Sequence, residues 1–149
     1  MTLSTAAPEK PNTQGKAMTN AIKVGDSFQH QRTCDPYRPL YYAAASGDFN
    51  PIHIDPEAGK AAGLGGNILQ GLCTMGWAVE AFGKFLGDPA RVTRVRVRFS
   101  RPVAVGDVIT YQGRVTAIEG DKVVASLHAR NQKDEDVLKG AVLEGRVSP

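Results

Sequence analysis

The segment that decides the fold is GLCTMGWAVEAFGKFL (residues 71–86), together with the change of pattern that follows it. Drawn as a helix, the segment carries apolar residues nearly all round and only three polar ones. A helix of that kind belongs in the interior of a protein. After Asp88-Pro89 the period falls to two, because RVRVRF (94–99) alternates charged and apolar residues as a half-buried strand does. The two patterns together predict one buried helix packed against a β-sheet.

More strands are expected on the C-terminal side of this pair. Three segments have the apolar, β-branched character of strands, and charged turns separate them: Val108–Ile118, Val123–Gln132 and Val137–Val147. The triplet at 24–26 repeats the pattern of the triplet at 105–107, Val-Gly-Asp, and a strand is expected after each. Together these segments predict an antiparallel sheet that covers one long helix, which is an α+β fold.

The bulk properties are those of one ordinary globular domain. The chain has 149 residues, 42% of them hydrophobic and 22% charged, which suffices for a single core. Residues 1–21 hold almost no large apolar side chain, so we expect a disordered tail there and a single domain at 22–149. No secretory signal or membrane-spanning run is recognisable, and the two cysteines, Cys34 and Cys73, cannot form a disulfide framework. A reducing cytoplasm is therefore the expected location.

The stretch YAAASGDFNPIH (42–53) carries the strongest sign of chemistry. In a continuous helix, residues five apart point about 140° away from each other, so Asp48 and His53 could not face one small molecule. Asn50 and Pro51 prevent such a helix, because the residue before a proline is pushed out of the helical region and proline fixes its own φ. A tight loop can then bring the carboxylate and the imidazole to one pocket.

A second element, GGNILQGL (65–72), is a glycine-bearing loop that runs into the buried helix. Backbone N–H groups in the first turn of a helix lack intrahelical partners and carry partial positive charge. One such amide aimed at a carbonyl oxygen forms half of an oxyanion hole. The loop is not a phosphate-binding P-loop, since no Lys-Ser/Thr pair follows the glycines.

Together these residues resemble the hydratase motif of the MaoC-like (R-specific) enoyl-thioester hydratases and dehydratases, a family with the hot-dog fold. The similarity extends over about residues 22–147, essentially the whole expected domain. Its motifs here are Gly47-Asp48-x-Asn50-Pro51-Ile52-His53-x-Asp55, Ile68-Leu69-Gln70-Gly71-Leu72 and Phe99-Ser100-Arg101-Pro102-Val103-x-Val105-Gly106-Asp107. The resemblance implies a sheet wrapped round the helix of residues 71–86 and subunits paired through their sheets.

The resemblance also implies the roles of individual residues. Asp48 and His53 would hold and activate a water molecule, and the Gly71 amide would bind the thioester oxygen. Asn50 would support the loop or touch substrate. Gln70 departs from the family, whose members often have histidine before the glycine. The implied reaction is the reversible hydration of trans-2-enoyl thioesters to (R)-3-hydroxyacyl thioesters in fatty-acid or polyketide-type metabolism, with no cofactor.

The implied partner is an acyl-CoA or acyl-carrier-protein thioester, and the implied assembly is a homodimer, with a heterodimer as the alternative. Two other functions fit the same fold: a non-catalytic acyl-binding subunit of a heterodimeric dehydratase, and a hot-dog thioesterase. The Asp-x-Asn-Pro-x-His arrangement disfavours both. A metal site at Asp48, His53 and Asp55 is also disfavoured, because no further His/Cys cluster accompanies these residues.

The positive charge of the chain is concentrated in one strip. The net charge is +3, yet five arginines fall between residues 91 and 101, and no acidic residue occurs between Asp88 and Asp107. Arg94, Arg96 and Arg98 form either a solvated face or a surface that attracts the phosphates of coenzyme A or an acidic carrier protein. Nucleic-acid binding is not expected, because no aromatic residues interleave with these arginines on that face.

Overall fold

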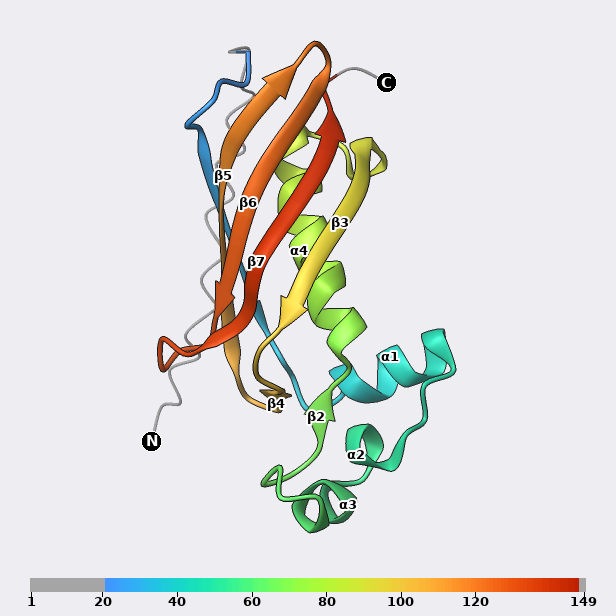
Figure 1. Ribbon diagram of the computed structural model, residues 1–149. Coiled ribbons are helices and arrows are strands. Elements are labelled where there is room, and N and C mark those ends of the chain that lie inside the picture. The colour runs from blue at the N-terminus through green and yellow to red at the C-terminus, as the bar shows by residue number, and fades with distance from the viewer. Residues whose placement is uncertain (1–20, 148–149) are drawn as a thin grey trace, which may run out of the picture.

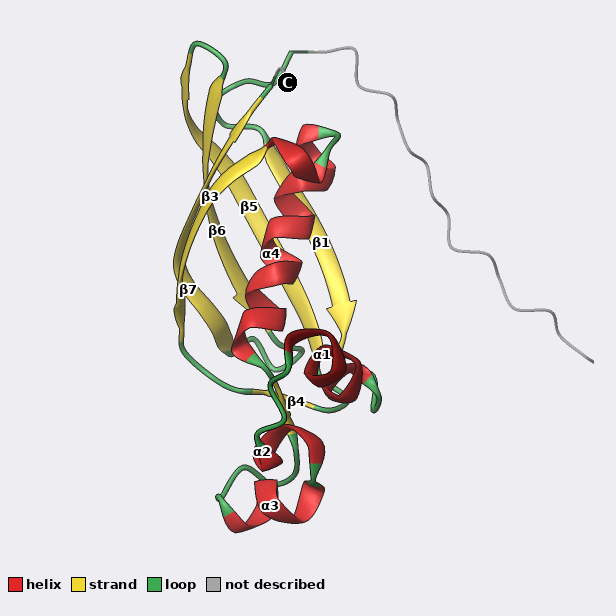
Figure 2. Cartoon of the chain, turned by 90° about the vertical axis from the view of Figure 1, so that its right-hand side faces the viewer, coloured by secondary structure: helices red, strands yellow, loops and turns green. Residues whose placement is uncertain are grey.

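In the computed structural model, which describes residues 21–147, an antiparallel sheet of five strands curves around one long helix, α4 (Gly71–Leu86) (Figures 1 and 2). In spatial order the strands are β1 (Ser27–Thr33), β5 (Val108–Glu119), β6 (Lys122–Arg130), β7 (Asp136–Arg146) and β3 (Val92–Phe99). All neighbours in the sheet are antiparallel. The predicted α+β fold and its buried helix are confirmed.

The remaining elements are short and lie mostly at one end of the molecule. They are α1 (Arg38–Ser46), α2 (Pro51–Ile54), α3 (Pro56–Ala61), the 3₁₀ turn η1 (Pro89–Arg91) and a two-stranded ribbon of β2 (Ile68–Leu69) and β4 (Val103–Ala104). The sequence patterns did not predict the ribbon, since a two-residue pairing has no periodicity of its own. The tail expected over residues 1–21 falls, apart from Ala21, outside the described residues. None of the helices within residues 21–147 has the length and apolar character needed to span a membrane.

The core lies between the concave face of the sheet and one face of α4. Along β6 every second residue is buried, and Trp77, Ala78 and Phe82 of α4 pack over this face. The phenol of Tyr111, fully buried beneath the first turns of α4, donates to the Thr74 carbonyl at 3.1 Å. A buried hydroxyl needs such a partner, and this one also fixes the height of the helix above the sheet.

Two glycines of α4 share one side of the helix but have different surroundings. At Gly83 an added Cβ would lie 2.7 Å from the Pro89 Cα, so the absence of a side chain lets η1 pack closely. At Gly76 an added Cβ would meet nothing within 4 Å. A close approach therefore explains Gly83 only.

The two glycines give a matched pair of alanine substitutions within one helix. Gly76→Ala should stabilise the protein by ~0.5–1 kcal/mol, because alanine loses less backbone entropy in a helix. Gly83→Ala should destabilise it by ~1–3 kcal/mol, since the new methyl group meets backbone that cannot rotate away. Urea unfolding midpoints at unchanged slope measure both. Equal effects of the two substitutions would contradict the packing described at Pro89.

A charged cluster fastens edge strand β1 to α4. The Glu80 carboxylate accepts from Arg32 Nε at 2.9 Å, pairs with Lys84 Nζ at 2.8 Å, and lies 3.4 Å from His30 Nε2. Burial would raise the pKa of the Glu80 carboxyl, but the hydrogen bonds from Arg32 and Lys84 outweigh burial and lower it to about 2. The folded protein therefore holds this carboxylate charged more firmly than the unfolded chain does.

This cluster predicts an acid-dependent contribution to stability. Because the pKa of Glu80 is lower in the folded state than its ordinary value of 4.5, its contribution is complete above that value and is lost as pH falls toward about 2. The stability difference between the protein and Glu80→Gln should therefore be largest near pH 6 and shrink steadily toward pH 2. Thermal unfolding across this range measures it, with the exposed Glu57→Gln as the control. A difference that stays constant with pH would refute the account.

Candidate active site

The site lies at the N-terminal end of α4, where α1, α2 and α3 gather beyond one end of the strands (Figure 2). α1 ends at Ser46, and Gly47 caps it with a left-handed φ of 77°. The Asn50 side chain then accepts from the Ile52 amide at 3.3 Å and caps α2, with Pro51 in its first turn. The backbone thus changes direction between Asp48 and His53, as the Asn-Pro pair predicts.

This change of direction places the two side chains together. The distance from Asp48 Oδ2 to His53 Nε2 is 3.7 Å. The two groups differ in exposure, since the His53 side chain is 11% exposed and that of Asp48 is 46% exposed. The imidazole is therefore held within the protein, while the carboxylate stands open to incoming molecules.

The tautomer of His53 follows from its second contact. His53 Nδ1 lies 2.9 Å from the Ile68 carbonyl oxygen, and a carbonyl can only accept, so Nδ1 carries the proton. In the neutral ring, Nε2 then presents a lone pair toward Asp48. Two acceptors 3.7 Å apart do not bond each other directly. A water molecule that donates one hydrogen to each would fit this arrangement.

One short segment of chain, residues 67–70, supports both residues of the pair. The Asn67 side-chain amide donates to the His53 carbonyl at 3.0 Å, and the Ile68 carbonyl accepts from the imidazole. The Gln70 side-chain amide donates to the Asp48 carbonyl at 3.4 Å. Sequence reasoning missed Asn67 and the Ile68 carbonyl. Nothing in the spacing of an amide side chain indicates which distant carbonyl it will meet.

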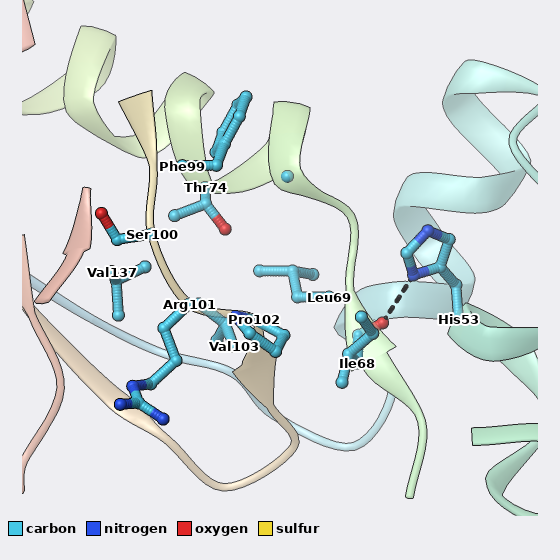
Figure 3. Close-up of a pocket in the computed structure, with 11 residues that line it drawn as sticks. His53, Ile68, Leu69, Thr74, Phe99, Ser100, Arg101, Pro102, Val103 and Val137 are labelled. Carbon is cyan, nitrogen blue, oxygen red and sulfur yellow. Dashed lines mark hydrogen bonds between the residues drawn. The ribbon is translucent and has the colours of Figure 1, made fainter. Parts of the chain in front are cut away.

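A cleft of about 300 Å³ lies beside this pair (Figure 3). Its walls are mainly apolar and include Leu69, Phe99, Val103 and Val137. Figure 3 shows His53 across the Ile68–Leu69 strand from Val137, at one end of the cleft. Asp48 is not part of the walls and stands next to His53 on the more exposed side. The cleft suits an apolar chain whose polar end reaches the imidazole.

Gly71 lines the same cleft at the first position of α4. Its amide lies in the first turn, where no intrahelical carbonyl is available, and it carries the partial positive charge of the helix start. An added Cβ would lie 3.3 Å from the Phe99 ring, so glycine leaves this side of the amide uncrowded. An oxygen atom bound in the cleft could therefore accept from it.

The geometry does not favour metal binding or thiol catalysis at this site. Within residues 21–147, no group of three His, Cys, Asp or Glu side chains is placed to hold a metal ion. Asp55 instead caps α3 by accepting from the Glu57 amide at 2.8 Å. Burial raises the pKa of the Cys73 thiol to about 11 and that of Cys34 to about 12, which makes both poor nucleophiles.

The arginine strip runs along β3 and borders a different hollow. Arg94 and Arg96, with Val142 and Glu144, line a depression of about 120 Å³ that shares no residue with the cleft. Arg94 lies 3.4 Å from the Glu144 carboxylate, which also pairs with Lys122 at 3.0 Å. Glu144 therefore offsets only part of the positive charge at this end of the strip.

Comparison with known proteins identifies a domain family and relatives that include enoyl-CoA hydratases. A model of the MaoC like domain matches residues 17–136. The peroxisomal enoyl-CoA hydratase 2 of Arabidopsis thaliana is 34% identical over 89% of this chain and 41% of its own length. The (R)-specific enoyl-CoA hydratase of Aeromonas caviae is 33% identical over 74% of this chain and 83% of its own length. The chain spans less than half the length of several curated relatives that it matches.

Solved structures agree with these relatives in fold. An R-hydratase of Pseudomonas aeruginosa in the unliganded form superimposes with a TM-score of 0.77 at 23% identity, over 84% of this chain and 82% of that one. This likeness confirms the predicted hot-dog fold, with the sheet wrapped around α4. Since the domain model matches most of the chain and the A. caviae relative is matched over most of its length, the chain belongs to the MaoC-like domain family.

Proposed function

We propose that this protein hydrates trans-2-enoyl thioesters to (R)-3-hydroxyacyl thioesters and catalyses the reverse dehydration, in fatty-acid or polyketide-type metabolism. The observation that carries the proposal is the pairing of Asp48 and His53 at 3.7 Å beside an apolar cleft that also contains Gly71. The names of the relatives, enoyl-CoA hydratases from a plant and a bacterium, support the same reaction.

Hydration adds a hydroxyl to Cβ and a proton to Cα of the enoyl group. A water molecule held between Asp48 and His53 donates to both, which directs an oxygen lone pair toward Cβ. His53 Nε2 accepts a proton as the C–O bond forms, and the pair returns one proton to Cα, so neither residue is changed after turnover. General acid–base exchange of this kind contributes typically ~10²–10⁴ in rate.

Attack at Cβ moves negative charge onto the thioester oxygen. We propose that the Gly71 amide, with the positive end of α4 behind it, stabilises that charge. The acyl chain then occupies the apolar part of the cleft, between Leu69, Phe99 and Val137. Asn50 acts through the loop, because its side chain is engaged in capping α2.

We propose that a single domain at residues 22–149 binds an acyl-CoA or acyl-carrier-protein thioester. Neither a nucleic acid nor a membrane is a proposed partner. A homodimer paired through the sheets is the proposed assembly, and a heterodimer is the alternative. The cytoplasm is the proposed location, since the buried thiols of Cys34 and Cys73 are free and suit a reducing compartment.

The proposed pair predicts two inactive but folded variants. Asp48→Asn and His53→Ala should each lower kcat for enoyl-CoA hydration by ~10²–10⁴, because the first change removes the carboxylate charge and the second removes the proton acceptor. Loss of the enoyl-thioester absorbance measures the rate, and circular dichroism checks the fold. Asp121→Asn and His128→Ala, which make the same two changes at residues that do not line the cleft, should keep near-native rates. Near-native turnover of either site variant would defeat the proposal. Release of free thiol by the unmodified protein would indicate a thioesterase instead.

The Gly71 amide can be removed without disturbing the helix. Gln70 has φ −58° and ψ 135°, the conformation that a residue takes before proline, and proline is favoured at the first position of a helix. Gly71→Pro should therefore fold but lose ~10²–10³ in kcat through the missing N–H. Gly71→Ala adds a Cβ near Phe99 yet keeps the amide, so it separates crowding from loss of the donor. Equal rates for the two variants would exclude the amide as a catalytic donor.

A further inference from the structure

Gln70 is the most deeply buried polar side chain next to the site. It is 1% exposed, and its Nε2 donates to the Pro39 carbonyl at 3.1 Å and to the Asp48 carbonyl at 3.4 Å. Gln70 immediately precedes Gly71 and caps α4 with its backbone alone, because its side chain makes no cap hydrogen bond. The side chain is therefore free to reach back across the site to the loop that carries Asp48.

We propose that Gln70 is a positioning residue that fixes Asp48 relative to the start of α4. This inference rests on the proposed function, and it assigns to Gln70 a part in the reaction that involves no contact with substrate. Its two amide hydrogens hold the first turn of α1 and the catalytic loop at a set distance from the Gly71 amide.

The chemistry of the amide supports this role over simple filling of space. A carboxamide nitrogen has two hydrogens, and both neighbouring groups are carbonyl oxygens that can only accept, so the nitrogen must face them. The Gln70 Oε1 atom is then left buried, without a hydrogen-bond partner among the described residues. An unpartnered buried acceptor costs stability, and an apolar side chain of the same size would avoid that cost. The two hydrogen bonds that the amide donates compensate for this cost, and an apolar side chain could not make them.

Asp48 has few other restraints. Its amide donates to Ser46 Oγ at 3.2 Å, and its Oδ1 accepts from the Asn50 amide at 3.4 Å. Ser46 is the last residue of α1 and Asn50 caps α2, so both of these bonds come from within two residues of Asp48. The bond from Gln70 comes from 22 residues away in the sequence and joins the loop to the buried helix. His53, by contrast, is held separately through Asn67 and the Ile68 carbonyl.

The central test is Gln70→Met, which keeps the size of the side chain and removes both donors. Misplacement of a reacting group by about 1 Å can cost on the order of 10²-fold in rate, so kcat for enoyl-CoA hydration should fall ~10–100-fold. KM should change by less than about twofold, because the apolar walls that hold the acyl chain stay in place. Gln112→Met makes the same change on the outer face of the sheet, where Gln112 bonds Gln29, and should leave both constants unchanged.

Two further variants distinguish positioning from a general structural role. Gln70→His restores one donor and should recover most of the lost kcat, which a mere change in packing would not do. In the Asp48→Asn background, Gln70→Met should cause little further loss, because residues that act through one group are non-additive. If Gln70→Met is too unstable to assay, Gln70→Leu replaces it in both comparisons.

The outcomes separate this inference from the proposed function. Near-native kcat in Gln70→Met, or a full additional loss in the Asp48→Asn background, would overturn the positioning role while hydration itself stands. Absence of enoyl-CoA hydration by the unmodified protein would instead overturn the proposed function. The inference is supported if kcat falls in Gln70→Met, if Gln70→His restores most of it, and if Gln70→Met causes little further loss in the Asp48→Asn background.

Discussion

The site depends on where the first turn of α4 stands above the sheet. Tyr111 holds this turn through the Thr74 carbonyl, and the pairing of β2 with β4 fixes the chain just before it. Both restraints lie in or against the apolar core, where close packing leaves little freedom to shift. The amide of Gly71 is therefore placed by the same contacts that make the domain stable.

The polar residues of the site have no such core of their own. Asp48 and His53 lie in a region of very short helices, and a four-residue helix such as α2 is unstable in isolation. Side chain–backbone hydrogen bonds with residues 67–70 connect this region to the segment that leads into the buried helix. A precise site is thus built on irregular backbone because rigid elements next to it supply the restraints.

Sequence patterns predicted the parts of the structure that follow from periodicity and from backbone chemistry. The buried helix, the antiparallel strands and the break at Asn50-Pro51 all express local rules, and the structure agrees with each. The β2–β4 ribbon and the hydrogen bonds made by Asn67 and Gln70 join residues that are distant in the sequence. No repeating pattern accompanies such contacts, so the sequence does not predict them. Gly76 and Gly83 lie on one face of α4, yet a close approach exists only at Gly83, so spacing along the sequence does not distinguish the two glycines.

The hydrogen-bonding of His53 distinguishes this site from one built for nucleophilic catalysis. In a nucleophile–histidine–carboxylate site, the carboxylate bonds Nδ1 and orients the ring while Nε2 activates a hydroxyl or thiol. Here a backbone carbonyl takes the orienting position at Nδ1, and the carboxylate of Asp48 faces Nε2 on the reacting side. The nearby Cys73 thiol is buried, and its pKa is raised to about 11. With a neutral ring, His53 Nε2 and the Asp48 carboxylate are two acceptors 3.7 Å apart, and one water molecule can donate to both, which an alcohol or thiol side chain with a single hydrogen cannot do.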